Sequence, residues 1–181
     1  AGGRERLQDI ASALAAARAD DGPRLQPRRP DQWHATLCFI GYDQRQQVTP
    51  GLLDAFARVA AQVPAHAFTV ERLAYWPQSG AVVALPHPCD ALQALCDGTR
   101  DAIRGQRLRP LQVTTQPHVT LAYLDRHLPA QPWLEAVDCA GAAIHVDGFE
   151  LLFNPGGRYE PLAAWTLSGR TLATPPQQAQ L

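Results

Sequence analysis

The sequence predicts an α+β fold in which antiparallel sheets carry helices on their outer faces. Three segments have apolar residues at helical spacing, and between them lie short β-rich runs separated by turn signals. The chain also reads as two similar halves, each with a helix, a loop, a strand carrying His-x-Thr-Leu, and further strands. At 181 residues it fits a single domain, residues 1–181, made of two similar lobes.

Three helices are predicted from apolar spacing and from signals at their ends. The first covers "GRERLQDIASALAAARAD", residues 3–20, and stops at the Asp-Gly-Pro breaker that follows. The second covers residues 50–62, because Thr49 offers an N-cap and a proline fills the first helical position. The third begins with Asp90 as its cap and has apolar residues along one side.

Strands are predicted where β-branched and apolar residues run between turn residues. They cover residues 33–40, 68–76, 81–86, 111–124, 144–153 and 160–167. Pro117 interrupts the fourth run, so we expect an edge position or a bulge there. The basic, proline-rich stretch before the first strand is expected to be a loop. The tail, residues 174–181, is expected to be disordered.

Composition argues against a membrane-spanning protein, a strongly basic protein and a disulfide-stabilised fold. The chain is 46% hydrophobic and 18% charged, which is ordinary for a soluble globular protein, and no apolar run approaches the ~20 residues of a membrane span. Its formal net charge of −1 provides no global basic field, so an anionic substrate must be held by a local cluster of donors. Its cysteines lack C-x-x-C spacing, which favours reduced thiols in a cytoplasmic protein over a disulfide framework.

Two segments, "WHATLCFIG" and "PHVTLAYL", place polar residues in runs that otherwise read as buried strand. Side chains in a strand alternate between faces, so His34 shares a face with Thr36, and His118 with Thr120. A single His-x-Thr in a strand is more often a half-buried histidine than a catalyst. His-x-Thr-Leu, however, should arise by chance only about 0.04 times in a chain of this composition, so two copies indicate function.

The two motifs suit phosphate-ester chemistry if their strands meet. A neutral imidazole accepts a proton from water or a hydroxyl, and a protonated one donates to the leaving oxygen. The threonine hydroxyls, directed at non-bridging oxygens, would stabilise the charge that develops on phosphorus. This chemistry needs no metal and no cofactor. A zinc site is not favoured, because the sequence has neither H-E-x-x-H nor a Cys/His cluster.

With these motifs the sequence resembles the two-histidine (2H) phosphoesterases, and within them the LigT-like RNA 2′,3′-cyclic phosphodiesterases. "RRPDQWHATLCFIG" and "QPHVTLAYL" resemble the two motif regions of that branch. "FTVERLAYWPQSGAVVALP" and "FELLFNPGGRYEPLAAWTL" resemble its middle and closing hairpins. The resemblance implies a bilobal, pseudo-symmetric LigT-like fold in which two antiparallel sheets flank a central cleft, with helices on the outer faces.

The reaction implied by this resemblance opens a terminal 2′,3′-cyclic phosphate of RNA to a 2′-phosphomonoester without a metal. RNA ligation in the reverse direction is also associated with the family. By motif position, His34 would be the acid and His118 the base, while Thr36 and Thr120 would hold phosphate oxygens. The residues alone leave open which histidine is which. The expected partners are RNA ends or nucleotides with a 2′,3′-cyclic phosphate, and the protein is expected to be a monomer.

The chain departs from the family pattern in three places. The branch usually opens with a short apolar strand before its first helix, whereas this chain starts at the helix. If that strand is absent and not merely truncated, one sheet loses a member. Cys38 stands where the branch often carries a basic residue. Tyr123 stands where the branch carries an arginine that the resemblance implies to be a phosphate contact, which makes Tyr123 a candidate substrate-binding residue. Alternation places Cys38 on the face of His34, and Tyr123 on the face opposite His118.

Other residues could supply the missing charge and a surface for a base. Arg158 is the favoured cation, because its turn closes the second hairpin, with Arg28 and Arg29 as alternatives. Trp33, next to His34, and Tyr75 and Trp76, at the end of the middle hairpin, could stack on a nucleotide base, a contact worth ~1–3 kcal/mol. For Trp76 a core position is the stronger expectation.

Two other functions stay open. The first is a relative that acts on a small cyclic nucleotide or an ADP-ribose derivative. The second is a non-catalytic RNA- or nucleotide-binding module, against which the two intact motifs argue, since binding alone needs no pair of histidines.

Overall fold

The computed structural model describes residues 3–17, 24–41, 47–128, 130–139, 141–156 and 158–168. Its helices are α1 (Gly3–Ala16), α2 (Pro50–Gln62), α3 (Asp90–Gly105) and α4 (Gln131–Glu135), with a 3₁₀-helix at Pro30–Gln32. Its strands are β1 (Gln26–Pro27), β2 (Cys38–Phe39), β3 (His66–Trp76), β4 (Ala81–Pro86), β5 (Gln112–Val113), β6 (Val119–Tyr123), β7 (Ala143–Val146), β8 (Gly148–Phe153) and β9 (Glu160–Thr166). The predicted tail, 174–181, lies outside the described residues.

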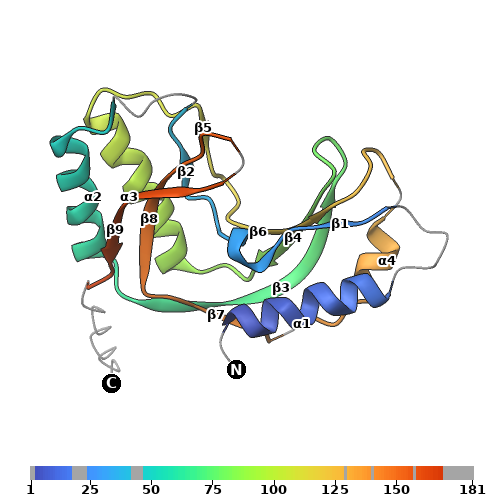
Figure 1. The fold of residues 1–181 in the computed structure, drawn as a ribbon. Coiled ribbons are helices and arrows are strands. Elements are labelled where there is room, and N and C mark those ends of the chain that lie inside the picture. Colours follow the sequence, from blue (N-terminus) through green and yellow to red (C-terminus); the bar gives the residue numbers. More distant parts are fainter. Residues whose placement is uncertain are drawn as a thin grey trace, which may run out of the picture.

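One lobe is built on a five-stranded antiparallel sheet with the order β1-β6-β4-β3-β7. Helices α1 and α4 cover one face of this curled sheet (Figure 1). The apolar stripe of α1 (Leu7, Ile10, Leu14) is buried there, in one core with residues of β3, β4, β6 and α4. The helix therefore forms where its apolar stripe has a sheet to cover.

The other lobe contains two small sheets, β2-β5 and β8-β9, with α2 and α3 against them (Figure 1). Leu52 and Phe56 of α2 and Ile103 of α3 form a buried cluster onto which Phe149 and Trp165 pack. Helix α2 has the predicted bounds, and the Thr49 side chain accepts a hydrogen bond from the amide of Leu52 at 3.3 Å. The lobe thus holds four strands in two pairs, where the resemblance implied a single sheet.

The prediction of one strand over residues 144–153 was wrong. The run divides at Asp147: β7 pairs with β3 in the large sheet, and β8 pairs with β9 in the other lobe. Gly148 makes this transfer possible, because a Cβ at this position would lie 2.6 Å from the carbonyl oxygen of Trp165. A strand that appears continuous in sequence therefore joins the two lobes.

Element ends and short elements differ from the predictions. The N-cap of α3 is Cys89, and Asp90 lies in the first turn, where a carboxylate favours the positive end of the helix dipole. Helix α1 ends at Ala16, and the predicted end at residue 20 lies outside the described residues. Strand β1, the 3₁₀-helix and α4 were not predicted, since two to five residues carry too little periodicity. No helix in the described part of the chain is long and apolar enough to cross a membrane.

Candidate active site

The two His-x-Thr segments lie side by side. Ala35 and Val119, the middle residues of the two motifs, form an isolated antiparallel bridge. In an antiparallel pair the residues on either side of a bridge also face one another. His34 is therefore opposite Thr120, and Thr36 is opposite His118. The strand predicted over residues 33–40 is only partly formed, because β2 begins at Cys38 and a bend at Leu37 precedes it.

Both imidazoles are held in the same way. The Nδ1 of His34 lies 2.8 Å from the backbone oxygen of Gln32, and the Nδ1 of His118 lies 2.9 Å from that of Gln116. A carbonyl can only accept, so each Nδ1 carries the proton of the hydrogen bond. Each Nε2 is then left to accept a proton when the ring is neutral, or to donate one when it is charged. Both acceptors are backbone oxygens, which every residue has, so the identity of the residue two positions before each histidine could not predict these contacts.

Each histidine also packs against the edge or face of an aromatic ring from a hairpin. The ring centroids of His34 and Tyr159 are 5.0 Å apart, with an interplanar angle of 75°. Those of Trp76 and His118 are 4.3 Å apart, with an angle of 65°. Trp76 ends β3 in the hairpin β3–β4, and Tyr159 precedes β9 in the hairpin β8–β9. Sequence analysis considered Trp76 but missed Tyr159, since nothing along the chain links it to His34.

The environment of His34 favours its neutral form. Burial lowers the pKa of His34 below its usual value, and the positive charges of Arg28 and His118 lower it further, while the hydrogen bond to Gln32 opposes them. An effect of His118 on His34 is expected when two imidazoles share one site. Near neutral pH, His34 therefore tends to be a proton acceptor in the empty site.

The two threonines are half-buried, and within the described part of the chain neither hydroxyl makes a hydrogen bond. The backbone oxygen of Thr36 accepts a hydrogen bond of 2.7 Å from the Thr114 hydroxyl, which ties the first motif to the segment leading into the second. Two hydroxyls and two Nε2 atoms thus remain available at the junction of the motifs.

A family model described as the 2′-5′ RNA ligase superfamily matches residues 5–157. The chain belongs to this superfamily. It is a two-histidine phosphoesterase, as the resemblance of its motifs implied. None of the curated protein sequences matches it significantly.

Solved structures confirm the bilobal LigT-like α+β fold of this superfamily member. TT0787 of Thermus thermophilus has a TM-score of 0.69 and 23% identity, over 92% of this chain and 94% of its own. Escherichia coli LigT in complex with 3′-AMP has a TM-score of 0.66 and 22% identity, over 91% and 92%. LigT in complex with NADP⁺ has a TM-score of 0.61 and 26% identity, again over 91% and 92%.

The structure corrects the expected orientation of Tyr123 in this phosphoesterase. Val82 of β4 pairs with Ala122, but the next residue, Val83, pairs with Thr120, so Leu121 is an extra residue in β6. Such a bulge reverses the alternation beyond it. Tyr123 consequently shares a face with Thr120. We call this side of the large sheet the histidine face; the opposite side packs on α1 and α4.

Core packing agrees with the bulge. Leu121 and Ala122, although adjacent, both belong to the core on the α1 side of the sheet. Tyr123 packs instead with Trp76 against a cluster on the other side of β3 and β4. The bulge lies at Leu121, while Pro117, where an irregularity was expected, precedes β6.

Two of the other predicted site residues, Trp33 and Arg158, differ in their exposure. Trp33 is 9% exposed and belongs to the core beneath α1, and its Nε1 is buried without a hydrogen-bond partner. This burial leaves little of the ring for stacking on a base. Arg158 is exposed in the turn between β8 and β9, next to Tyr159.

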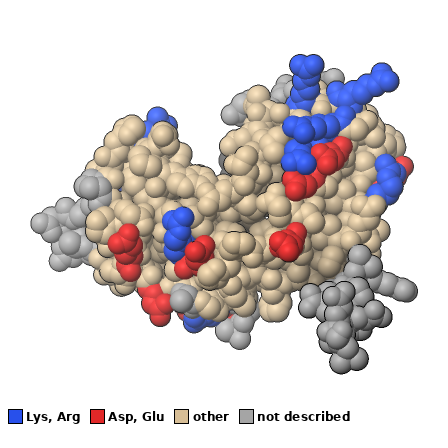
Figure 2. All heavy atoms as spheres, turned by 180° about the vertical axis from the view of Figure 1, so that it is seen from behind, with Lys and Arg blue, Asp and Glu red and all other residues tan. Residues whose placement is uncertain are grey.

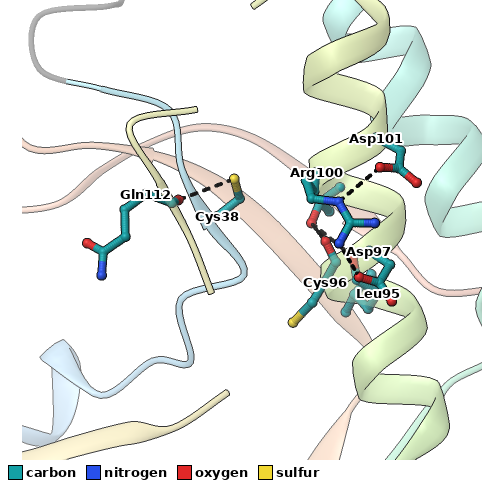
Figure 3. Close-up of polar contacts among 8 residues, drawn as sticks. Cys38, Leu95, Cys96, Asp97, Arg100, Asp101 and Gln112 are labelled. Atoms are coloured by element: carbon teal, nitrogen blue, oxygen red, sulfur yellow. Dashed lines mark hydrogen bonds and ion pairs between the residues drawn. The ribbon is translucent and has the colours of Figure 1, made fainter. Parts of the chain in front are cut away.

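Cys38 was expected on the face of His34, and this was wrong. The bend at Leu37 turns Cys38 toward the core under α2 and α3, and its Sγ lies 3.6 Å from the oxygen of Gln112 (Figure 3). Burial raises the pKa of the Cys38 thiol, and Arg104 and Arg100 of α3 partly offset this. Cys38 is therefore a neutral packing residue. All four cysteines are free thiols.

A cavity of about 910 Å³ extends from the first motif along β2 and β8. His34, Thr36 and Tyr159 contribute to its lining, and Val119 of the second motif does too, but His118 does not. Viewed from behind, the hollow between the lobes is bordered mainly by uncharged residues (Figure 2). Among the described residues, no group of three or more His, Cys, Asp or Glu side chains could hold a metal ion.

Proposed function

We propose that this phosphoesterase opens 2′,3′-cyclic phosphate ends of RNA to 2′-phosphomonoesters without a metal, using His34 and His118 as acid–base catalysts. One observation carries the proposal: the bridge between Ala35 and Val119 sets the motifs side by side, while backbone carbonyls hold both Nδ1 atoms. Two Nε2 atoms then act on one phosphate.

In the proposed reaction, one neutral imidazole takes a proton from the attacking water as its oxygen bonds to phosphorus. The bond from phosphorus to the 3′ oxygen breaks, and the protonated imidazole gives its proton to that oxygen. Each such proton transfer typically contributes ~10²–10⁴-fold. The hydroxyls of Thr36 and Thr120 donate hydrogen bonds to the non-bridging oxygens, whose charge grows in the transition state.

The roles of the two histidines can be separated by pH. The resemblance implies that His34 is the acid, whereas its lowered pKa in the empty site favours the neutral form, the state of a base. A bound phosphate anion would stabilise protonated His34, so the acid role requires substrate to bind first. If His34 is the base, His34→Ala removes the low-pH limb of the kcat/KM profile; if it is the acid, the high-pH limb disappears.

The experiment is turnover of an RNA oligonucleotide ending in a 2′,3′-cyclic phosphate, with the position of the product phosphate identified by NMR. His34→Ala and His118→Ala should each lower kcat by ~10²-fold or more. His66→Ala is a matched control, because its Nδ1 also lies 2.9 Å from a carbonyl two residues earlier, that of Pro64, yet its ring is in β3 outside the site. Unchanged turnover in both site variants would refute the proposal.

A small cyclic nucleotide, or an ADP-ribose derivative, is the second candidate substrate. Two observations favour it: the chain lacks a global basic field, with a net charge of −1, and the related LigT was solved with 3′-AMP and NADP⁺. A substrate panel compares a 2′,3′-cyclic mononucleotide with an oligonucleotide carrying the same end. Higher kcat/KM for the mononucleotide would identify the smaller substrate, and nucleotide binding without turnover would identify a binding module.

A further inference from the structure

Arg28 makes two contacts with β6, one through its backbone and one through its side chain. It directly follows β1, and its amide donates a 2.8 Å hydrogen bond to the carbonyl of Leu121, the extra residue of the bulge. Its guanidinium carbon lies 5.7 Å from the centroid of the Tyr123 ring, a cation–π arrangement. The bulge turns Tyr123 toward the histidine face, so the Arg28 side chain is held on this face too.

The guanidinium of Arg28 has no anionic partner among the described residues. Its Nε is buried without a hydrogen-bond partner, and within the described part of the chain Arg28 makes no ion pair. Its sequence neighbour differs, because Arg29 pairs with Asp31 at 3.2 Å. An unsatisfied buried donor is unfavourable, and the ring of Tyr123 compensates only in part. A hydrogen-bond acceptor on a bound ligand would satisfy this donor.

The Arg28 guanidinium is connected to both motifs, to the first by its charge and to the second through two aromatic rings. The charge of Arg28 lowers the pKa of His34, so it lies within electrostatic range of the first motif. Its support, Tyr123, packs in one cluster with Trp76, whose ring contacts His118. Arg28 therefore places a permanent positive charge near His34, and the rings of Tyr123 and Trp76 connect it to His118.

We propose that Arg28, supported by the ring of Tyr123, is a substrate-contact residue that binds the non-bridging oxygens of the phosphate. This inference rests on the proposed function, because it names the group that holds the phosphate on which that function depends. A planar guanidinium can offer two parallel N–H donors to a phosphate, which an ammonium cannot. Arg28 thus takes the role that sequence analysis favoured for Arg158, which is exposed in a turn.

Binding provides the first test. The affinities of inorganic phosphate and of adenosine 2′-monophosphate are measured by calorimetry for the wild type, Arg28→Gln and Arg29→Gln. Arg28→Gln should weaken both ligands about tenfold or more, and the loss should shrink in high salt. Arg29→Gln, the neighbouring arginine with its own carboxylate, should stay within about twofold. Equal affinities for the two variants would overturn the assignment.

Two further points are tested separately: the support of Arg28 by the Tyr123 ring, and the position of Arg28 near His34. Tyr123→Phe keeps the ring and should keep the affinity, whereas Tyr123→Leu removes it and should weaken phosphate binding. Arg28→Gln should also move the NMR titration of the His34 ring to higher pH, because a nearby positive charge is lost. If Arg28→Gln does not fold, Arg28→Lys retains the charge without the planar fork and should bind phosphate with intermediate affinity. Wild-type affinity in Arg28→Lys and in Tyr123→Leu would contradict the proposal.

Failure of this inference can be told apart from failure of the proposed function. Binding needs no turnover, so selective loss of phosphate affinity in Arg28→Gln supports the assignment even if the wild type opens no cyclic phosphate. Conversely, normal turnover of cyclic ends together with identical binding and kcat/KM in Arg28→Gln and Arg29→Gln removes Arg28 from the site and leaves the function intact.

Discussion

At the scale of single residues, the Nδ1 atoms of His34 and His118 each make a hydrogen bond to the backbone. Each Nδ1 contacts the carbonyl of the residue two positions earlier, so each ring is oriented by the segment that immediately precedes it. The motif spacing was enough to predict which face each histidine shares with its threonine. The aromatic partners could not be predicted, because Trp76 and Tyr159 reach the histidines from hairpins distant in sequence.

Thr36 and Thr120 should matter less than the histidines. Replacing either by alanine removes one hydrogen bond to the phosphate, and we expect a loss of roughly ten- to a hundredfold in kcat. Threonine to serine at the same position keeps the hydroxyl and should retain most of the activity. Steady-state kinetics on a 2′,3′-cyclic nucleotide measures both. A serine variant as impaired as the alanine variant would show that the methyl group, not the hydroxyl, is what the site requires.

The charge state of His34 is open to direct measurement. Its pKa is lowered, so its NMR titration should have a midpoint below about 6.5. The unfolded chain then binds more protons than the folded one in the window between the two pKa values. This contribution to stability is therefore complete above pH ~6.5 and diminishes as the pH falls through that window. Inorganic phosphate should raise the midpoint. A midpoint above 6.5 in the free protein would contradict this account.

At the scale of elements, the extra residue in β6 determines which side chains reach the histidine face. Alternation predicted correctly that His118 and Thr120 lie together, and failed at Tyr123, because Leu121 shifts the register against β4. The sequence "VTLAY" contains no glycine or proline to mark this shift. Register depends on the neighbouring strand, so a single segment cannot reveal it.

Gly148, where the chain passes between lobes, should not tolerate a side chain. A Cβ there would lie 2.6 Å from the carbonyl oxygen of Trp165, so Gly148→Ala must displace β9. Overpacking of this kind typically costs about 1–3 kcal/mol of unfolding free energy. Gly156→Ala is the control, since nothing lies within 4 Å of its Cβ position. Denaturant unfolding compares the two, and equal stabilities would show that β8 and β9 can separate at no cost.

At the scale of the whole molecule, the internal repeat predicted the arrangement better than any single element. Two halves with the same motif imply two lobes, and the bridge between Ala35 and Val119 brings the two motifs together. The strand that crosses from one lobe to the other was not predicted. Residues 144–153 read as one β-rich run, and only tertiary pairing with β3 and β9 divides it.

Removal of divalent metal should leave the activity unchanged. In the proposed reaction His34 and His118 transfer the protons, and protein side chains stabilise the charge on the phosphate. We therefore expect kcat after exhaustive EDTA treatment to equal that of the untreated enzyme, with a bell-shaped kcat/KM profile in both. Complete loss of turnover, restored by added Mg²⁺, Mn²⁺ or Zn²⁺, would contradict the mechanism.

The diagonal arrangement of the motifs, with His34 opposite Thr120 and Thr36 opposite His118, has a consequence for the enzyme between turnovers. After one proposed reaction, the imidazole that began neutral carries a proton and its partner has lost one. Because the two halves offer the same donors, this inverted form is also the form that would catalyse closure of the 2′-phosphomonoester to the cyclic phosphate. Only proton exchange with water or buffer returns the pair to its starting state. Turnover at very low buffer concentration should therefore become sensitive to the buffer, because resetting the two imidazoles is a step of the cycle in its own right.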